Sequence, residues 1–204
     1  MRMRFLRGLW LAALLGVSTS GAAPGAAGAE SLLADAIQRG DRGAVLALLN
    51  THTDVNAPQS DGATALHWAA YLDDADTTAR LLKAGARVDT PNNYGVTPLS
   101  LACGNGNPGV IDQLLKGGAD PNRAVRAGET PLMLAARSGN ADAVKMLLRA
   151  GAAVDAKETW NGQTALMWAA AAGHAAVVQA LIDHRADIRA RSNSGATALL
   201  FAAR

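Results

Sequence analysis

The side chains best suited to acid–base or metal chemistry are four histidines and a single cysteine: His52, His67, His174, His184 and Cys103. A zinc site needs several cysteine or histidine ligands close together, and none of these residues has a partner at ligand spacing. One cysteine also cannot form a disulfide within the chain. We therefore expect no metal centre and no bound cofactor.

The acidic cluster Asp73-Asp74-Ala75-Asp76 is a second candidate, as a set of calcium ligands. It lacks the central glycine and the closing glutamate of a calcium-binding loop, so a solvated turn that caps the next helix is the better interpretation. The chain also has no Gly-x-Ser-x-Gly motif and no glycine-rich phosphate loop after a strand. These features predict a protein that is not an enzyme and has no evident small-molecule substrate.

One stretch recurs along the chain and predicts the helices that position these residues. Its clearest copy is Thr164-Ala165-Leu166-Met167-Trp168-Ala169-Ala170. Its copies begin at threonines spaced by 33, 33, 34 and 33 residues, with a glycine two places before each. Self-similarity with this period is typical of proteins built from stacked repeats. The copies start at Thr64, Thr97, Thr130, Thr164 and Thr197.

Each copy is predicted to begin a short helix. The threonine hydroxyl can accept a free backbone N–H, and Pro98 and Pro131 follow at the first helical position, where the missing donor costs nothing. We expect the helix to end at a residue in the left-handed conformation, which glycine adopts without penalty. That residue is Asp73 in one unit and glycine in the others, namely Gly40, Gly106, Gly139 and Gly173.

A second helix, antiparallel to the first, is predicted from apolar pairs further along each unit: Leu48-Leu49, Leu81-Leu82, Leu114-Leu115, Leu147-Leu148 and Leu181-Ile182. Glycine ends this helix in three units, but His52 and Arg185 take its place near the two ends of the array. A left-handed residue other than glycine costs about 1 kcal/mol or somewhat more, so the repeats at both ends of the array should be less stable. His52 and His184 lie at the carboxyl ends of these helices, where positive charge is favourable.

Helices this short are marginal alone in water, so each unit must be stabilised by its neighbours. Large apolar residues share one position in the repeat and are predicted to lie in the core: Trp68, Leu101, Leu134, Trp168 and Phe201. Cys103 occupies a position that alanine fills in other units. We expect it to be a buried small residue and not a reactive thiol.

The unit resembles the ankyrin repeat, whose pattern is G-x-T-P-L-H-x-A-A-x-x-G-x, then a leucine pair, then G-A-D-V-N. The segment from Gly62 to Ala70 carries the opening part, and the segment from Gly118 to Asn122 carries the closing part. The resemblance implies an all-α repeat solenoid, a curved stack of antiparallel helix pairs with β-hairpin or loop fingers. It also implies a hydrogen bond between His67 and Thr64, and a structural role for His174 at the turn between helices.

The resemblance covers residues 30–204, which we divide into five to six units, the last one incomplete: 30–60, 61–93, 94–126, 127–160, 161–193 and 194–204. The extra residue of the 34-residue step falls within residues 157–161, so we expect one longer finger. The sequence stops at Arg204, directly after a first helix. An alternative is therefore that these repeats are the amino-terminal part of a larger regulatory or catalytic protein truncated at residue 204.

Residues 1–29 are predicted to be a signal peptide. Arg2, Arg4 and Arg7 precede an apolar run at residues 9–17, and Ala27-Gly28-Ala29 before Glu30 matches a cleavage site. We expect an exported protein of bacterial type, periplasmic or secreted, without stable membrane insertion once the signal is removed. The alternative is a membrane anchor formed by residues 9–17, although a spanning helix needs ~20 residues.

The net charge of the chain does not favour nucleic acid as a partner. The chain carries a formal charge of +2, which becomes −1 once the three arginines of the predicted signal are removed. Binding to nucleic acid requires a clustered basic face, which this sequence does not predict.

What the resemblance implies instead is binding of a protein partner on a concave face lined by first helices and fingers. The corresponding variable positions flank each finger glycine, as Ala63 and Val96 do, or follow the paired small residues of the first helix. Tyrosine, tryptophan and arginine dominate protein-binding hot spots, and those types single out Tyr71, Tyr94, Arg126, Arg137 and Trp160. The alternative is that Tyr71 packs on a neighbouring unit and Trp160 rests on its own finger. The sequence thus predicts a non-enzymatic, exported scaffold.

Overall fold

The computed structural model describes residues 31–51, 53–125 and 127–203, which form eleven α-helices and no β-strand. The helices are α2 (Leu32–Gln38), α3 (Arg42–Asn50), α4 (Ala65–Tyr71), α5 (Ala75–Lys83), α6 (Pro98–Asn105), α7 (Pro108–Lys116), α8 (Pro131–Ser138), α9 (Ala141–Arg149), α10 (Ala165–Ala171), α11 (Ala175–Asp183) and α12 (Ala198–Ala202). The predicted signal peptide lies outside the described residues.

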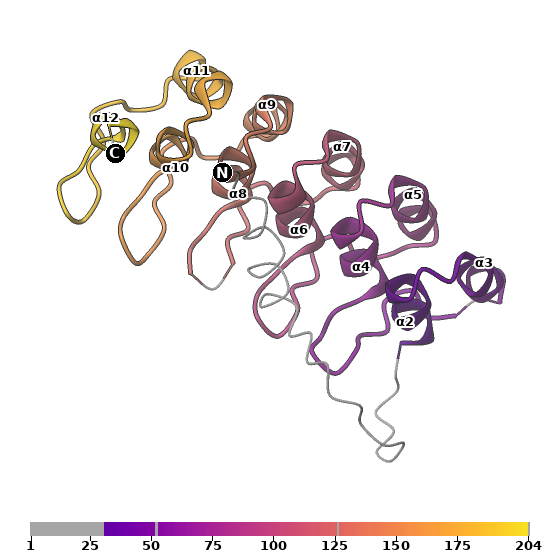
Figure 1. Ribbon diagram of the computed structural model, residues 1–204. Coiled ribbons are helices and arrows are strands. Elements are labelled where there is room, and N and C mark those ends of the chain that lie inside the picture. The colour runs from indigo at the N-terminus through magenta and orange to yellow at the C-terminus, as the bar shows by residue number, and fades with distance from the viewer. Residues whose placement is uncertain (1–30, 52, 126, 204) are drawn as a thin grey trace, which may run out of the picture.

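The helices form two parallel rows (Figure 1). The even-numbered helices α2 to α12 make an inner row, and the odd-numbered helices α3 to α11 make an outer row behind it. Each inner helix from α2 to α10 packs on the outer helix that follows it, and inner helices of adjacent units, α12 included, pack on one another. The molecule is an all-helical repeat solenoid, as the repeat pattern predicts.

Helix starts and stops follow the sequence signals. Thr97 caps α6 by accepting the Ser100 N–H over 3.2 Å, and Pro98 is the first helical residue. Gly106, which ends α6, has φ +78°, and Asp73 adopts the left-handed conformation at the same point of its unit, with φ +57°. Arg185 is also left-handed, with φ +63°, as predicted, whereas His52 lies outside the described residues.

The core runs through the whole array. The leucine at the second position of each inner helix is buried in five units, as Leu33, Leu66, Leu99, Leu132 and Leu166. The sixth, Leu199, is 78% exposed. Burial raises the pKa of the Cys103 thiol, which keeps the residue a neutral, inert part of the core, as predicted.

The predicted core position needs one correction. Trp68, Leu101 and Leu134 are buried there, but Trp168 and Phe201 are only partly buried. Phe201 lies on α12, and α10 is the one described helix in extensive contact with α12. The pattern identifies the side of the helix correctly, but the degree of burial depends on what covers that side.

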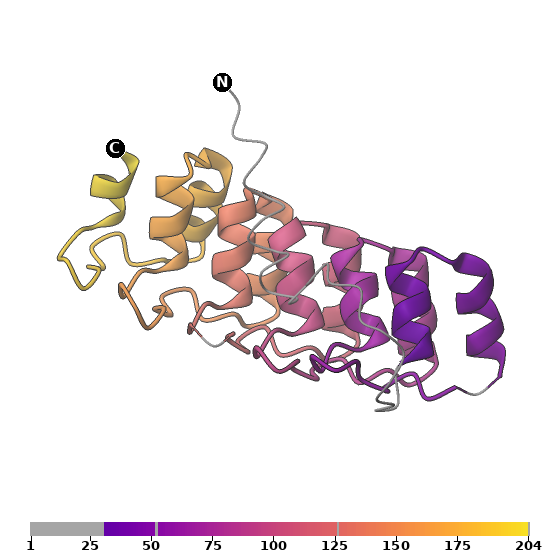
Figure 2. The same cartoon turned by 60° about the horizontal axis from the view of Figure 1, so that its bottom comes forward.

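The loops that join each outer helix to the next inner helix project from one edge of the array (Figure 2). We call them fingers 1 to 5, for residues 51–64, 84–97, 117–130, 150–164 and 184–197. All five contain an equivalent backbone bond from an N–H to a carbonyl across the turn: Gln59 to Ala63, Asn92 to Val96, Val125 to Glu129, Glu158 to Gln163 and Ser192 to Ala196. The fingers are loops and not β-hairpins in the described residues, and finger 4 is longer by one residue, as predicted.

Candidate protein-binding surface

Neighbouring fingers are hydrogen-bonded to one another. The backbone N–H of Asn93 on finger 2 donates to the Asp61 carbonyl over 2.9 Å, and its side-chain Nδ2 donates to the Ser60 carbonyl over 3.1 Å. Between fingers 3 and 4, the backbone N–H and the hydroxyl of Thr159 both donate to the Ala127 carbonyl, over 3.1 and 2.8 Å. Side chains at the finger tips are therefore presented from an ordered backbone.

The same arrangement joins fingers 4 and 5. Asn193 donates its backbone N–H to the Asn161 carbonyl over 2.7 Å and its side-chain Nδ2 to the Trp160 carbonyl over 3.0 Å. Gly162, with φ +65°, allows this approach, because a Cβ atom there would collide with the Asn193 side chain. The glycine of the repeat thus serves the contact between fingers as well as the turn itself.

Trp160 lies at the tip of finger 4 and is 77% exposed. Its backbone N–H donates to the Glu158 Oε2 atom over 2.7 Å. The main chain is held by hydrogen bonds while most of the indole lies in solvent.

Glu158, which sequence reasoning missed, is buried beneath this tip, with 5% of its surface exposed. Burial would raise the pKa of its carboxyl, but hydrogen bonds from the backbone N–H groups of Gln163, Asn161 and Trp160 outweigh burial and lower that pKa. The side chain therefore remains a carboxylate at neutral pH. The available signal was a glutamate inside a lengthened loop, since a carboxylate can accept from N–H groups a few residues on.

The two tyrosines lie in different environments. Tyr94, on the tip of finger 2, is 41% exposed, and its backbone N–H donates to Asn92 Oδ1 over 3.0 Å. Tyr71 ends α4 and is partly buried, with its ring edge-on to Trp68 at a centroid distance of 5.8 Å. Tyr71 thus packs on its own helix, whereas Tyr94 is exposed on finger 2.

Arg137 is exposed near the carboxyl end of α8. Its guanidinium lies 5.0 Å from the centre of the Trp168 ring, close enough for a cation–π interaction. Its backbone carbonyl accepts from His174 Nε2 over 3.1 Å, which gives His174 the structural role expected of it. Arg126 lies outside the described residues.

The region around Arg137 also holds a half-buried glutamate. Burial raises the pKa of Glu129, the nearby charge of Arg137 lowers it, and the nearby charge of Glu158 raises it further. Trp168 Nε1 is buried there without a hydrogen-bond partner in the described chain. By contrast, Trp68 Nε1 donates to Gln59 Oε1 over 2.6 Å. Glu158 occupies the finger position of Gln59 but accepts from its own loop instead.

Ala63 and Val96, predicted among the variable surface positions, are buried, with 0% and 1% of their surfaces exposed. They directly precede the capping threonines, and the carbonyl of Val96 accepts from His67 Nε2 over 3.0 Å. At these two units the position after the finger glycine therefore belongs to the core, whereas the equivalent residues Glu129, Gln163 and Ala196 are only partly buried.

His67 has the structural role that the resemblance implies. Its Nδ1 lies 3.0 Å from the Thr64 backbone nitrogen and 2.9 Å from the Thr64 hydroxyl, while its Nε2 meets the Val96 carbonyl of the next unit. Because an N–H can only donate and a carbonyl can only accept, the neutral ring carries its proton on Nε2. Burial lowers the pKa of His67, partly opposed by the Val96 carbonyl.

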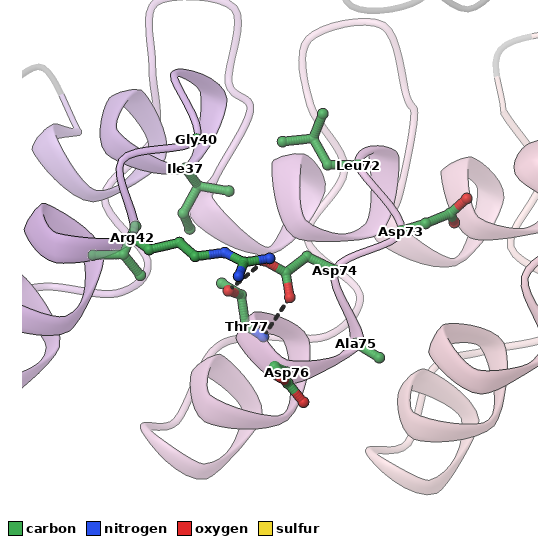
Figure 3. Close-up of a pocket in the computed structure, with 10 residues that line it drawn as sticks. Ile37, Gly40, Arg42, Leu72, Asp73, Asp74, Ala75, Asp76 and Thr77 are labelled. Carbon is green, nitrogen blue, oxygen red and sulfur yellow. Dashed lines mark hydrogen bonds between the residues drawn. The ribbon is translucent and has the colours of Figure 1, made fainter.

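A separate cleft of about 570 Å³ lies between the first two units (Figure 3). Its floor includes the acidic cluster, and Figure 3 shows the Arg42 side chain extending toward Asp74. Asp74 caps α5, accepting the N–H and the hydroxyl of Thr77 over 2.9 and 2.8 Å. The cluster therefore contains the helix cap that the sequence predicts.

Within the described residues, no three or more histidine, cysteine, aspartate or glutamate side chains are grouped so as to hold a metal ion. Nor does any helix in that part of the chain have the length and apolar character needed to cross a bilayer.

Comparison with known protein families agrees with the architecture. The family described as "Ankyrin repeats (3 copies)" matches residues 33–125 and 132–204, and a second, "Ankyrin repeats (many copies)", matches residues 113–148. The chain belongs to the ankyrin repeat family. A 42-residue stretch of this ankyrin repeat protein is also 50% identical to Neurogenic locus notch homolog protein 1 of Xenopus tropicalis. That match covers 21% of this chain and 2% of the other protein, so it reflects the repeat alone.

Proposed function

We propose that this ankyrin repeat protein is an exported, non-enzymatic scaffold of bacterial type. It binds a protein partner on the concave face that its fingers and inner helices line. The observation that carries the proposal is the 77% exposed indole of Trp160 on a finger whose backbone is fixed by hydrogen bonds. A large exposed aromatic side chain on an ordered backbone is well suited to be a binding hot spot.

Tyr94 and Arg137 extend the proposed surface. Tyr94 is exposed on finger 2, and Arg137 of the inner helix α8 lies over Trp168 of the inner helix α10. Arginine and tyrosine are the other residue types enriched in hot spots. Tyr71 contributes less to this surface, because its ring packs against Trp68.

Affinity capture with the full chain from an exported protein fraction tests the function, with the captured protein identified and its affinity then measured. We expect the double variant Tyr94→Ala/Trp160→Ala to lose at least about 100-fold in affinity, as two hot-spot residues would. A double variant that binds like the parent would refute the proposed surface. A control pair on the outer helices, Arg80→Ala/Arg149→Ala, should retain the affinity.

Export is tested separately. The motivating observation is the charged, apolar and small-residue sequence of residues 1–29. Mass spectrometry of the mature protein should give an amino terminus at Glu30. A mature protein that keeps residues 9–17 in a membrane fraction would favour the anchored alternative.

A further inference from the structure

Finger 4 differs from the other fingers at the residue that closes the loop. In the other four fingers this residue is uncharged, namely Gln59, Asn92, Val125 and Ser192. In finger 4 it is Glu158, a buried carboxylate. A charged group is costly to bury unless strong hydrogen bonds compensate it, so its presence needs a structural reason.

The reason lies in the hydrogen bonds to its two oxygens. Oε2 accepts the Trp160 N–H over 2.7 Å, and Oε1 accepts the Asn161 and Gln163 N–H groups over 2.9 and 2.8 Å. In finger 2, the single amide oxygen of Asn92 serves two N–H groups. The longer loop of finger 4 presents three, and a carboxylate has enough lone pairs for all of them.

The backbone carbonyl of Trp160 is also hydrogen-bonded. Its carbonyl accepts from Asn193 Nδ2 over 3.0 Å, so the N–H and the carbonyl of the residue are both bound, one within finger 4 and one from finger 5. The backbone of Trp160 is thus ordered before any partner arrives. Ordering a contact residue in advance removes a part of the entropy that binding would otherwise cost.

We propose that Glu158 is a positioning residue that holds Trp160 as an anchor for a protein partner with an apolar pocket of indole size. This inference rests on the proposed function. The residues on either side of Trp160 in finger 4, Thr159 and Asn161, are exposed and polar, as is Asn193, whose side chain donates to the Trp160 carbonyl. One aromatic anchor inside a polar rim is the arrangement of a protein–protein hot spot, whereas a bilayer surface would require an apolar face with basic side chains around it.

The positioning role is tested without a partner. Amide hydrogen exchange of the full chain should show residues 160, 161 and 163 exchanging at least about tenfold faster in Glu158→Gln than in the parent, because one acceptor oxygen is lost. Glu129→Gln, which changes a half-buried glutamate on finger 3, should leave these amides unchanged. If Glu158→Gln does not fold, Asn193→Ala is the second variant. It removes the hydrogen bond to the Trp160 carbonyl, leaves the buried Glu158 carboxylate in place, and should speed amide exchange at the tip of finger 4. Parent-like exchange in the folded variants would overturn the positioning role.

The anchor is tested by photo-crosslinking in the full chain from position 161, an exposed residue beside Trp160, with position 50 on α3 as the control. A protein crosslinked at 161 only is the expected result; a lipid, a glycan or no protein would overturn the anchor and the proposed function together. With the identified partner, Trp160→Ala should weaken binding at least about 30-fold, and Glu158→Gln about 5–10-fold.

The double variant Glu158→Gln/Trp160→Ala separates positioning from general structure. If Glu158 acts through Trp160, the double variant binds no more weakly than Trp160→Ala alone. Losses that simply add would overturn the proposal while leaving the protein-binding function in place. Because the exchange measurement needs no partner, failure of the positioning role is distinguished from failure of the function.

Discussion

Asn122 donates its side-chain Nδ2 to the Gly151 carbonyl of the next unit over 3.0 Å and accepts the Ala153 N–H over 2.7 Å. Asn56 makes the same pair of bonds at the first junction. Asp89 and Asp155 hold the equivalent positions at the alternate junctions, where each carboxylate accepts one N–H. The junctions therefore alternate along the array. An asparagine side chain both donates to a carbonyl and accepts an N–H at one junction, and an aspartate only accepts an N–H at the next.

Replacing Asp89 with asparagine should therefore stabilise the array. The new Nδ2 can donate to the Gly118 carbonyl, and we expect a gain of about 0.5–1 kcal/mol in the free energy of unfolding. Urea denaturation followed by circular dichroism measures the gain. Asn122→Asp is the matched control and should cost a similar amount. A destabilised Asp89→Asn variant would contradict the equivalence of the junctions.

Arg185 offers a second stabilising change. It ends α11 in the left-handed conformation with φ +63°, whereas Gly151 ends α9 with φ +91°. Left-handed strain costs about 1–2 kcal/mol, partly offset by the greater flexibility of unfolded glycine, so Arg185→Gly should raise stability by about 0.5–1 kcal/mol. Thermal unfolding measures the change. Gly151→Ala should lower stability because alanine disfavours the left-handed backbone conformation. No neighbouring atom would collide with the added Cβ atom, so this variant isolates the backbone effect.

The two tryptophans at the repeat's core position should differ in their contribution. Trp68 is buried and donates to Gln59, so Trp68→Ala should cost about 3–5 kcal/mol. Trp168 is partly buried and its Nε1 has no partner in the described chain, so Trp168→Ala should cost roughly half as much. Equilibrium denaturation of both variants gives the comparison. Equal costs would mean that the covering Arg137 side chain contributes as much as true burial.

His67 should make the stability fall in mild acid. Its pKa in the folded chain is lowered from the ordinary 6.5, so below about pH 6.5 the unfolded chain binds a proton that the folded chain rejects. The unfolding free energy then decreases by up to about 1.4 kcal/mol per pH unit, until the pH reaches the folded pKa. Above pH 6.5 this residue causes no pH dependence.

Denaturation of the parent and of His67→Gln between pH 5 and 8 measures this effect. Glutamine can still accept the Thr64 N–H as part of a capping box but does not titrate. The difference in unfolding free energy between the two proteins should therefore change below about pH 6.5 and be constant above it. A constant difference throughout would show that burial does not lower the pKa of the His67 ring in the folded protein.

The fold could be predicted from the sequence because every unit repeats the same local signals. Thr97, Pro98 and Gly106 each specify one step of a helix start or stop, and the agreement of five copies fixes the period. The left-handed residues Asp73 and Arg185 could be predicted in the same way, since the repeat shows where glycine is missing. Signals of this kind act within a few residues of the chain.

The finger surface could be predicted only in part, because it depends on contacts between units. Trp160 was identified by residue type, but the hold on its backbone depends on Glu158 and on Asn193 from another finger. Likewise, the partial burial of Trp168 depends on Arg137 from the preceding inner helix. A repeat pattern gives the position of a side chain in its unit, but it does not give the neighbour that covers it.

The described helices that are in extensive contact belong to the same unit or to adjacent units, and this has an evolutionary consequence. A duplicated or deleted unit needs to match just two junctions, so the array can change length without redesign of the remainder. The number of finger tips, and with it the footprint available to a ligand protein, can therefore evolve separately from the residues that set its affinity.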